Sequence, residues 1–335
     1  MQKRRAAVSK AWSATPSTGD QEVAGFRRKG VYMSIGVLHC GFLRAGFASL
    51  VLLLAALPTQ PVFGEAGAED TSRVVSVGGS ITEIIYALGA GDRLIAVDST
   101  SLHPPEAREH PDVGYMRRLS AEPILAMKPT LLLAVEDAGP ATVLDQLRAA
   151  GTKLVIVPDD PSPEGVLKKV NVIAEALGLE EEGQRVSDRL RQDLLRLGEA
   201  LEDVERTPSV LFLLSIGRGA PLAAGQDTSA ASIIALAGGR NAIDAFEGYK
   251  PLSPEAMVGA EPDFLLVTDR TLDLLGGTQE LLSRPEIAAT PAGRGARLIT
   301  MNGLLLLGFG PRTPKAIRNL AAGLHPELSI PSSAN

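Results

Sequence analysis

The sequence predicts an α/β protein of two Rossmann-like lobes with parallel sheets, joined by a long connecting helix, with the ligand in the cleft between the lobes. Short apolar runs alternate with helical segments, which is the pattern of a parallel sheet covered by helices. A motif occurs twice, as Gly-Tyr-Met-Arg-Arg-Leu-Ser-Ala-Glu at 114–122 and as Gly-Tyr-Lys-Pro-Leu-Ser-Pro-Glu at 248–255. Between the two copies, residues 164–204 show helical spacing alone.

The repeated motif indicates that the two lobes are related. In both copies, ten positions separate the Leu before the Ser from the Pro ahead of the next strand. A second echo, in the same order along the chain, links Ile84–Arg93 with Ile233–Asn241. Repeats of long period are typical of duplicated units, and 335 residues leave room for two lobes of ordinary domain size.

The amino-terminal lobe is expected at residues 72–160. Ser80 or Thr82 is expected to cap its first helix, because Ser and Thr side chains accept hydrogen bonds from the free N–H groups at helix starts. Gly151 is expected to end its last helix. The predicted strands are 73–77, 94–97, 130–135 and 153–157, and the predicted helices are 81–88, 122–127 and 141–150.

A helical connector is expected at 161–205 and the carboxy-terminal lobe at 206–330. A proline-rich junction at 158–163 opens the connector, and Gly178 divides it into two helices. The second lobe repeats the alternation of the first. Its predicted strands are 209–214, 264–267 and 297–300, and its predicted helices are 228–237, 278–283 and 313–322.

Residues 1–64 are predicted to be a leader with a signal peptide. Arg44 precedes an apolar run at 45–57, which is shorter than the roughly 20 residues of a membrane-spanning helix. Such a run after basic residues is typical of a cleaved secretory signal, and an N-terminal membrane anchor is the alternative. Met33 is an alternative start. The single cysteine, Cys40, precedes the run, so the mature chain should contain no disulfide.

The sequence lacks the common catalytic motifs. It contains no HExxH zinc motif, no GxSxG, no P-loop and no GxGxxG. His103 and His110 lie among prolines and are expected to be solvated, and His325 is expected on the surface near the chain end. We therefore expect a binding protein and no enzyme. An α/β enzyme that uses the Gly-Gly-Ser turn at 78–80 on a nucleotide is the alternative from another class.

Tyr115 is the strongest candidate for a binding residue. Its loop follows the strand at 94–97, and in open α/β lobes ligands bind beyond the carboxyl ends of the strands. Arg117 and Arg118 supply positive charge that favours tyrosinate over phenol, and a phenolate oxygen suits Fe(III), including haem iron. Haem propionates in turn pair with Arg or Lys. The alternative is a half-buried loop tyrosine that packs on Pro111.

Four segments resemble the haem-binding periplasmic proteins of bacterial haem ABC importers. They are 77–83, 113–122, 236–242 and 246–253. The likeness extends over about residues 72–325. The overall pattern is shared with ferric-siderophore and cobalamin binders, which are the alternative, whereas the Gly-Tyr-Met-Arg motif is the part specific to haem. The fold that the resemblance implies has two lobes joined by one long, stiff helix.

The resemblance implies a role for each residue of the site. Tyr115 would be the axial ligand of the haem iron, with Arg117 as its hydrogen-bonding or electrostatic support. Tyr249, Lys250 and Arg218 would line the opposite wall, Arg218 facing a propionate. Some relatives carry a His after the first strand of the second lobe and hold a second haem, but this chain has no His there. We therefore expect one haem b per chain, bound as five-coordinate Fe(III).

The resemblance also implies partners. Glu122 and Glu255, one per lobe, would dock on arginines of an inner-membrane ABC permease that works with its ATPase, and an outer-membrane haem receptor would act upstream. Both glutamates also fit a simpler role in stabilising helix N-termini. We expect a periplasmic monomer with no nucleic-acid partner, which captures haem and delivers it to the permease.

Overall fold

The computed structural model describes residues 70–331, apart from 203 and 218. The leader predicted at 1–64, with its apolar run at 45–57 and its alternative start, lies outside these residues, and so does Arg218. All the described residues belong to one compact unit. Among them, no helix is both long and apolar enough to cross a membrane.

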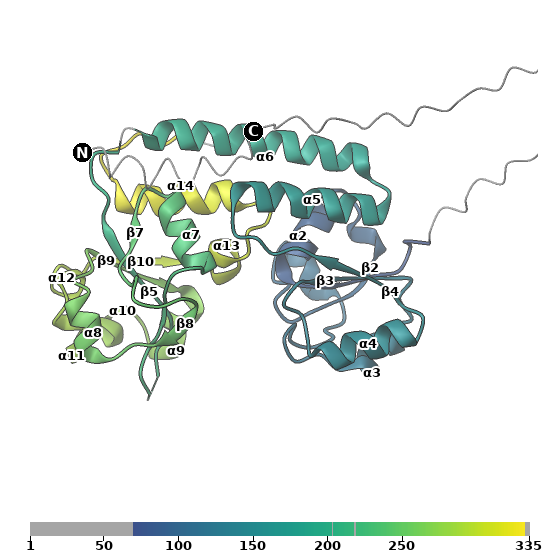
Figure 1. Cartoon of the computed structure of the whole chain (residues 1–335), viewed down its shortest axis with the longest axis horizontal. Helices are drawn as coiled ribbons and strands as arrows, with labels where there is room; N and C mark the ends of the chain where they lie inside the picture. The colour runs from purple at the N-terminus through teal and green to yellow at the C-terminus, as the bar shows by residue number, and fades with distance from the viewer. Residues whose placement is uncertain (1–69, 203, 218, 332–335) are drawn as a thin grey trace, which may run out of the picture. The chain divides into compact units, whose positions relative to one another are not determined.

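The amino-terminal lobe is a parallel sheet between helices. Its strand order is β2-β1-β3-β4, and every pair is parallel. All residues of β1 and β3 are buried, as expected where helices cover both faces of a sheet. Figure 1 shows α2 on one face and α3 and α4 on the other. The elements are β1 (Val74–Val77), α2 (Gly79–Ala87), β2 (Leu94–Val97), α3 (Ala121–Ala126), β3 (Leu131–Val135), α4 (Ala141–Ala149) and β4 (Lys153–Val157).

Helix α2 begins differently from the prediction. The side-chain cap expected at Ser80 or Thr82 is wrong, because both residues lie inside the helix and Gly78 occupies the N-cap position with a φ of 124°. The free N–H of Gly78 instead donates to the buried carboxylate of Asp98, at 3.0 Å. The helix start is therefore satisfied from the end of the neighbouring strand β2, a partner that local sequence does not reveal.

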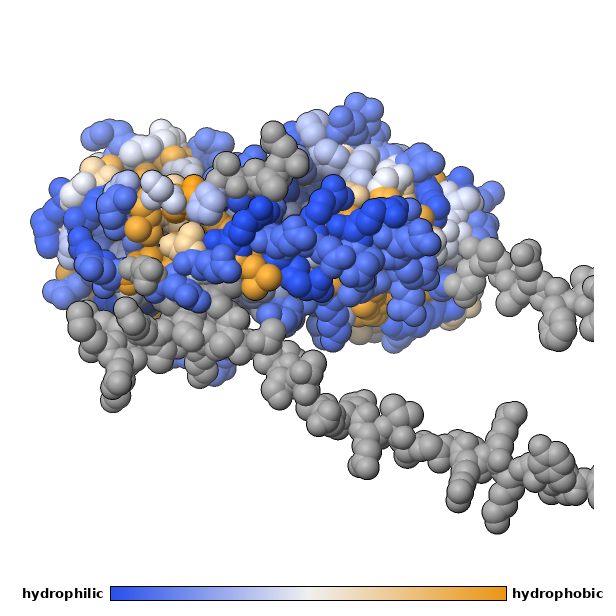
Figure 2. All heavy atoms as spheres, turned by 90° about the horizontal axis from the view of Figure 1, so that it is seen from above, coloured by the Kyte–Doolittle hydropathy of each residue, from blue (hydrophilic) through white to orange (hydrophobic). Residues whose placement is uncertain are grey.

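The connector consists of two helices packed against each other, α5 (Pro163–Leu177) and α6 (Glu180–Glu202). Gly178 ends α5 in the left-handed region with a φ of 66°. With 23 residues, α6 is roughly 34 Å long, and Figure 1 shows it running over both lobes. Figure 2 looks onto this side and shows mostly hydrophilic residues there, in keeping with the i,i+3 Arg–acid pairs of α6.

The carboxy-terminal lobe has a mixed sheet in place of the purely parallel one that the sequence predicts. Strands β10, β9 and β5 are parallel, whereas β6 pairs antiparallel with both β5 and β8. Strands of three residues are too short to show period-two alternation, which explains why β6 and β8 escape prediction. The strands are β5 (Ser209–Ser215), β6 (Leu222–Ala224), β7 (Arg240–Asn241), β8 (Tyr249–Pro251), β9 (Phe264–Thr268) and β10 (Leu298–Met301).

Eight helices surround this sheet in the described part of the chain. The predicted helices at 228–237, 278–283 and 313–322 correspond to α7, α10 and α14. One buried apolar cluster runs from the first lobe through α5 and α6 to α7 and α14, so the lobes share a core. The helices are α7 (Ser229–Leu236), α8 (Pro254–Gly259), α9 (Asp269–Leu275), α10 (Thr278–Ser283), α11 (Pro285–Ala288), α12 (Pro291–Arg294), α13 (Gly303–Leu307) and α14 (Thr313–Leu324).

Buried polar contacts also join the lobes. The side chain of Lys169 on α5 is 0% exposed, and its Nζ donates to Oδ1 of Asp159 at 2.7 Å and to the carbonyl oxygen of Gly308 at 3.3 Å. Nearby, Arg312 ahead of α14 donates two hydrogen bonds to the carboxylate of Glu83 on α2. A shared core and buried charge pairs together make a wide separation of the lobes costly.

The histidines are more buried than the sequence suggests. The prediction that His325 lies on the surface is wrong, because it ends α14 with 1% exposure and lies close to Gly238. Desolvation lowers its pKa. His103 and His110 are half-buried rather than fully solvated, and His110 Nε2 lies 3.0 Å from the hydroxyl oxygen of Tyr86.

Candidate ligand-binding cleft

A cavity of about 850 Å³ lies between the two lobes. Its lining comes from the loops that follow β1, β2 and β3 in the first lobe, and from β5, β8, α9 and α13 in the second. Its volume lies within the range of about 300–1,000 Å³ that is usual for small-molecule sites. The position beyond the carboxyl ends of parallel strands is the one that open α/β sheets use for ligands.

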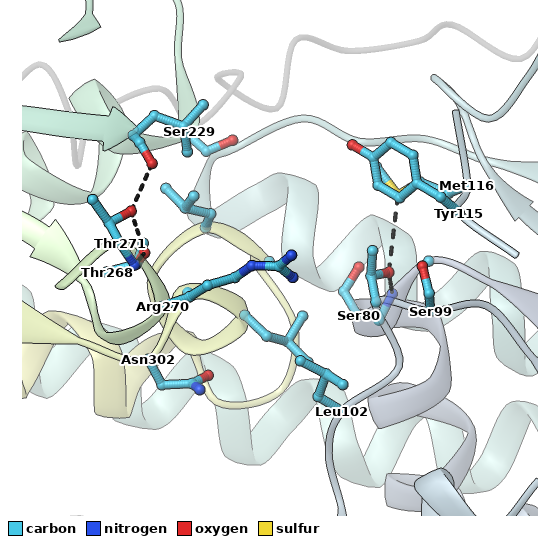
Figure 3. A pocket seen from close by; sticks show the side chains of 18 of the residues that line it. Ser80, Ser99, Leu102, Tyr115, Met116, Ser229, Thr268, Arg270, Thr271 and Asn302 are labelled. Atoms are coloured by element: carbon cyan, nitrogen blue, oxygen red, sulfur yellow. Dashed lines mark hydrogen bonds between the residues drawn. The ribbon is translucent and has the colours of Figure 1, made fainter. Parts of the chain in front are cut away.

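Tyr115 stands on the first-lobe wall of this cavity (Figure 3). Gly114 precedes it with a φ of 100°, a conformation that favours glycine, and Oδ1 of Asp112 accepts a hydrogen bond from the Gly114 N–H at 2.7 Å. The glycine conformation and this hydrogen bond together hold the backbone of the loop just before the tyrosine. Its side chain is half-buried, so its hydroxyl group is accessible from the cavity.

Two arginines contact Tyr115. Arg117 Nη1 donates a hydrogen bond to the hydroxyl oxygen of Tyr115 at 2.8 Å, and Nη2 of the same guanidinium group forms an ion pair with Asp137. The guanidinium carbon of Arg118 lies 5.9 Å from the centre of the Tyr115 ring. The structure thus brings a phenol oxygen and a cationic hydrogen-bond donor together at the wall of the cavity.

Tyr249 lies on the opposite wall, in strand β8. Burial raises the pKa of Tyr249, an effect partly offset by hydrogen bonds from Ala230 and Thr228 and by the charge of Arg117. Its ring packs edge-on against Phe212, with 6.5 Å between the ring centres. At neutral pH this residue therefore presents a protonated phenol to the cavity.

Lys250 and Arg218 have no observed place at the cavity. Lys250 is the next residue of β8 and is exposed; it does not line the cavity, and its Nζ lies 5.6 Å from the ring centre of Phe246. Neighbouring residues of a strand point to opposite faces, so Tyr249 and Lys250 cannot both face the ligand. Arg218 lies outside the described residues.

Arg270 is a cavity residue that the sequence analysis missed. It follows β9 in the first turn of α9, and Figure 3 shows its guanidinium group directed into the cavity from the second lobe. Within the described part of the chain, this guanidinium group has no ion pair and no hydrogen bond. Its position directly after a predicted strand could have identified it as a binding residue, because the carboxyl ends of the strands face the cleft in this fold.

Each lobe also exposes a leucine to the cavity. Leu102 is 41% exposed and Leu274 is 77% exposed, and both line the pocket. Large apolar side chains left in contact with water at a concave site are typical of a surface that a ligand covers. The cavity therefore combines apolar walls with a few polar groups, which suits a flat hydrophobic ligand that carries charged substituents.

Glu122 and Glu255 occupy matching positions outside the cavity. Each is the second residue of its helix, α3 or α8, and each is exposed. Hydrogen bonds with its own backbone N–H and with Ser253 lower the pKa of Glu255. Figure 1 shows both helices on the side of the lobes away from α6, so the two carboxylates belong to the same side of the protein.

These features define a two-lobed solute-binding protein. Residues 74–303 match the family described as periplasmic binding protein, and the chain belongs to this family. The fold class predicted from the sequence is thereby confirmed, with the mixed second sheet as its one difference.

Several solved structures are similar over nearly their whole length. The periplasmic haem-binding protein RhuT from Roseiflexus sp. RS-1, in its apo form, is 42% identical, with a TM-score of 0.74, covering 76% of this chain and 98% of that one. A periplasmic haem-binding protein from Pseudomonas aeruginosa is 34% identical, with a TM-score of 0.73, covering 78% and 95%. BhuT, solved with two haems, is 38% identical, with a TM-score of 0.72, covering 75% and 98%.

More distant relatives include a protein that is named for a different ligand. The vitamin B12-binding protein of Photorhabdus laumondii is 28% identical over 254 residues, which cover 76% of this chain and 88% of the relative. An uncharacterised ABC transporter substrate-binding lipoprotein of Bacillus subtilis is 25% identical over 266 residues, covering 77% and 82%.

Proposed function

We propose that this protein binds haem in the interlobe cavity and delivers it to an inner-membrane ABC permease with its ATPase. The observation that carries the proposal is the Tyr115 hydroxyl group, held by Arg117 at the wall of a cavity of about 850 Å³ with exposed leucines on both sides. Identities of 34–42% to the haem-binding proteins RhuT, BhuT and that of Pseudomonas aeruginosa support it, since the vitamin B12-binding relatives reach 28–29%, although the haem-binding protein HmuT is itself only 26–27% identical.

Each cavity residue has a part in holding the haem. Tyr115 binds Fe(III) as tyrosinate, and Arg117 stabilises the negative charge on its oxygen. Leu102 and Leu274 pack on the porphyrin faces. Arg270 pairs with a propionate, because it is a cation in the cavity with no carboxylate partner among the described residues. The protonated phenol of Tyr249 is a poor anionic ligand, so we propose one five-coordinate haem b per chain.

A hemin titration tests the ligand. We expect the visible spectrum of hemin to change on mixing, to saturate at one equivalent, and to show a tyrosinate-to-iron charge-transfer band that Tyr115→Phe abolishes. A ferric siderophore or cobalamin binder on the same scaffold predicts no spectral change with hemin. Saturation by cyanocobalamin with no response to hemin would reject the proposal in favour of that alternative.

Delivery assigns a role to the two exposed glutamates, one on each lobe. We propose that Glu122 and Glu255 dock on cations of the permease, and that the protein acts in the periplasm as a monomer after export with a cleaved signal peptide. An outer-membrane haem receptor supplies the haem, and the protein has neither a catalytic activity nor a nucleic-acid partner. The family and the haem-binding neighbours support this placement.

The double variant Glu122→Ala with Glu255→Ala tests docking. It should titrate with hemin like the wild type but support haem uptake poorly, because the lost charges lie outside the cavity. A control pair, Glu181→Ala with Glu199→Ala, removes two exposed glutamates from α6. Equal uptake by both double variants would count against docking through α3 and α8.

A further inference from the structure

Asp137 stands beside the Tyr115 loop without belonging to it. It follows β3, and its carboxylate accepts a hydrogen bond from Nη2 of Arg117, while Nη1 of the same guanidinium group donates to Tyr115 at 2.8 Å. Among the described residues, the three side chains form a relay in which the guanidinium group of Arg117 donates to both the Asp137 carboxylate and the Tyr115 hydroxyl oxygen. Asp137 itself does not line the cavity.

Backbone hydrogen bonds hold the loop of Asp137 next to the loop of Tyr115. The Gly139 N–H donates to the carbonyl oxygen of Met116 at 2.9 Å, and the Leu119 N–H donates to the carbonyl oxygen of Gly139 at 2.8 Å. These two hydrogen bonds bind the loop after β3 to the loop that carries Tyr115. They keep the backbone near Asp137 beside the Tyr115 loop, so that its carboxylate, 41% exposed, lies within reach of Arg117.

Arg117 needs such a carboxylate partner. Its side chain is 53% exposed, and a long, solvated arginine loses considerable rotamer freedom when it is held in one geometry. A carboxylate on the second nitrogen fixes the plane of the guanidinium group through two points instead of one. It also offsets the positive charge of Arg117, so that Arg270 is, among the described residues that line the cavity, the arginine without a carboxylate partner.

From this geometry we infer that Asp137 is a positioning residue for the iron ligand: it keeps Arg117 on the Tyr115 oxygen and away from the haem propionates. The inference rests on the proposed haem-binding function. In Asp137→Asn, the Arg117–Tyr115 hydrogen bond is occupied less often, so the tyrosinate-to-iron charge-transfer band should shift and haem should dissociate about two- to fivefold faster, since exposed ion pairs have modest effects.

A double-mutant cycle on the full-length protein tests the relay, with haem transfer to apomyoglobin as the measure of dissociation and the charge-transfer band as the second readout. Asp137→Asn should shift the band and speed haem dissociation in the wild-type background but change neither in the Arg117→Leu background. Asp137→Glu, which keeps the carboxylate, should have a smaller effect than Asp137→Asn on both readouts. Asp145→Asn, which removes an exposed, paired carboxylate from α4, should leave both readouts unchanged.

Three results would overturn the inference. An effect of Asp137→Asn that persists in Arg117→Leu would mean that the carboxylate does not act through the arginine. An equal effect of Asp145→Asn would mean that the change in net charge, and not the position of Asp137, causes the effect. An unchanged charge-transfer band and an unchanged dissociation rate in Asp137→Asn would reject the positioning role, although the proposal of haem binding would stand. Failure of the wild type to bind hemin would instead reject the proposed function and this inference with it.

Discussion

The two lobes each present one tyrosine to the same cavity, but the two phenols differ in kind. Tyr115 lies on a loop, accepts a hydrogen bond from Arg117 and has a second arginine over its ring. Tyr249 lies on a strand, and burial raises its pKa. The repeated motif supplies a tyrosine and a cation in both copies, yet only the first copy brings the two together.

Backbone conformation explains the difference. In a loop, residues two apart can turn toward each other, as Tyr115 and Arg117 do. In β8, consecutive residues face opposite sides, so Lys250 turns away from the cavity when Tyr249 faces it. The repeated motif therefore gives two different walls, one with a phenol that is hydrogen-bonded to a guanidinium group and one with a half-buried phenol whose neighbouring cation in the strand, Lys250, does not line the cavity.

Tyr115→Ala is the change that should break this asymmetry most severely. Without the iron ligand, haem affinity should fall by about a hundredfold or more, which corresponds to roughly 3 kcal/mol, and the charge-transfer band should vanish. Tyr249→Ala is the matched control in the other lobe. It should keep the band and lose less than about fivefold in affinity, since it removes only packing and one neutral group. Equal losses from the two variants would contradict the asymmetry.

Much of this arrangement was predictable because it depends on local pattern. The strands of the first lobe, helices α7, α10 and α14 and the position of the Tyr115 loop all follow from apolar periodicity and strand order. The charge of Arg117 near Tyr115 was expected from their place in one loop, and the hydrogen bond between them from the resemblance to haem-binding proteins. Element type and short-range partners are what a single sequence encodes most directly.

The features that the sequence did not predict depend on contacts between segments that lie far apart in the chain. Arg270 is one arginine among many in the sequence, and only the fold directs it into the cavity. The orientation of Lys250 depends on pairing between β8 and β6, two strands too short to recognise. His325 is buried because the end of α14 packs near Gly238, a residue far away in the chain.

The two walls face one ligand only while the lobes keep their spacing, and Lys169→Met should test whether the buried lysine holds that spacing. The substitution leaves Asp159 without its buried partner. Because the Asp159 side chain is 36% exposed, the free energy of unfolding should fall by roughly 2 kcal/mol, less than for a fully buried pair, and haem should dissociate faster from less constrained lobes. Urea unfolding and a dissociation assay measure the two effects. Lys168→Met changes the exposed neighbour on α5 and should alter neither. Identical midpoints for both variants would show that Lys169 does not join the lobes.

Arg270→Leu and Lys250→Leu compare two cations of the same lobe. The first should weaken haem binding about fivefold through loss of one partly exposed charge pair, and the second should have no effect. Haem dimethyl ester, whose propionates carry no charge, sharpens the test: Arg270→Leu should bind it as well as the wild type does. If Arg270→Leu weakens the ester as much as haem, the arginine is not pairing with a propionate.

The smallest expected effect concerns two histidines, one in each lobe. Burial lowers the pKa of His325, and desolvation also lowers that of the less buried His103. In the unfolded chain the histidine rings take up a proton near pH 6.5, whereas in the folded protein the rings of His325 and His103 stay neutral to lower pH. Below about pH 6.5 the unfolded state therefore binds more protons, and the free energy of unfolding declines as the pH falls toward the lowered folded-state pKa values.

The slope of stability against pH, rather than its level, separates these two contributions, because Asn at position 325 also changes packing. Between about pH 6.5 and 5, His325→Asn should flatten the decline more than His103→Asn, since a ring with 1% exposure loses more hydration. Denaturant unfolding across that range measures the slopes. A larger flattening from His103→Asn would contradict this order. It would mean that His103, which lies between the lobes near Arg312 and Lys315, contributes more to the pH dependence of stability than the buried His325 does.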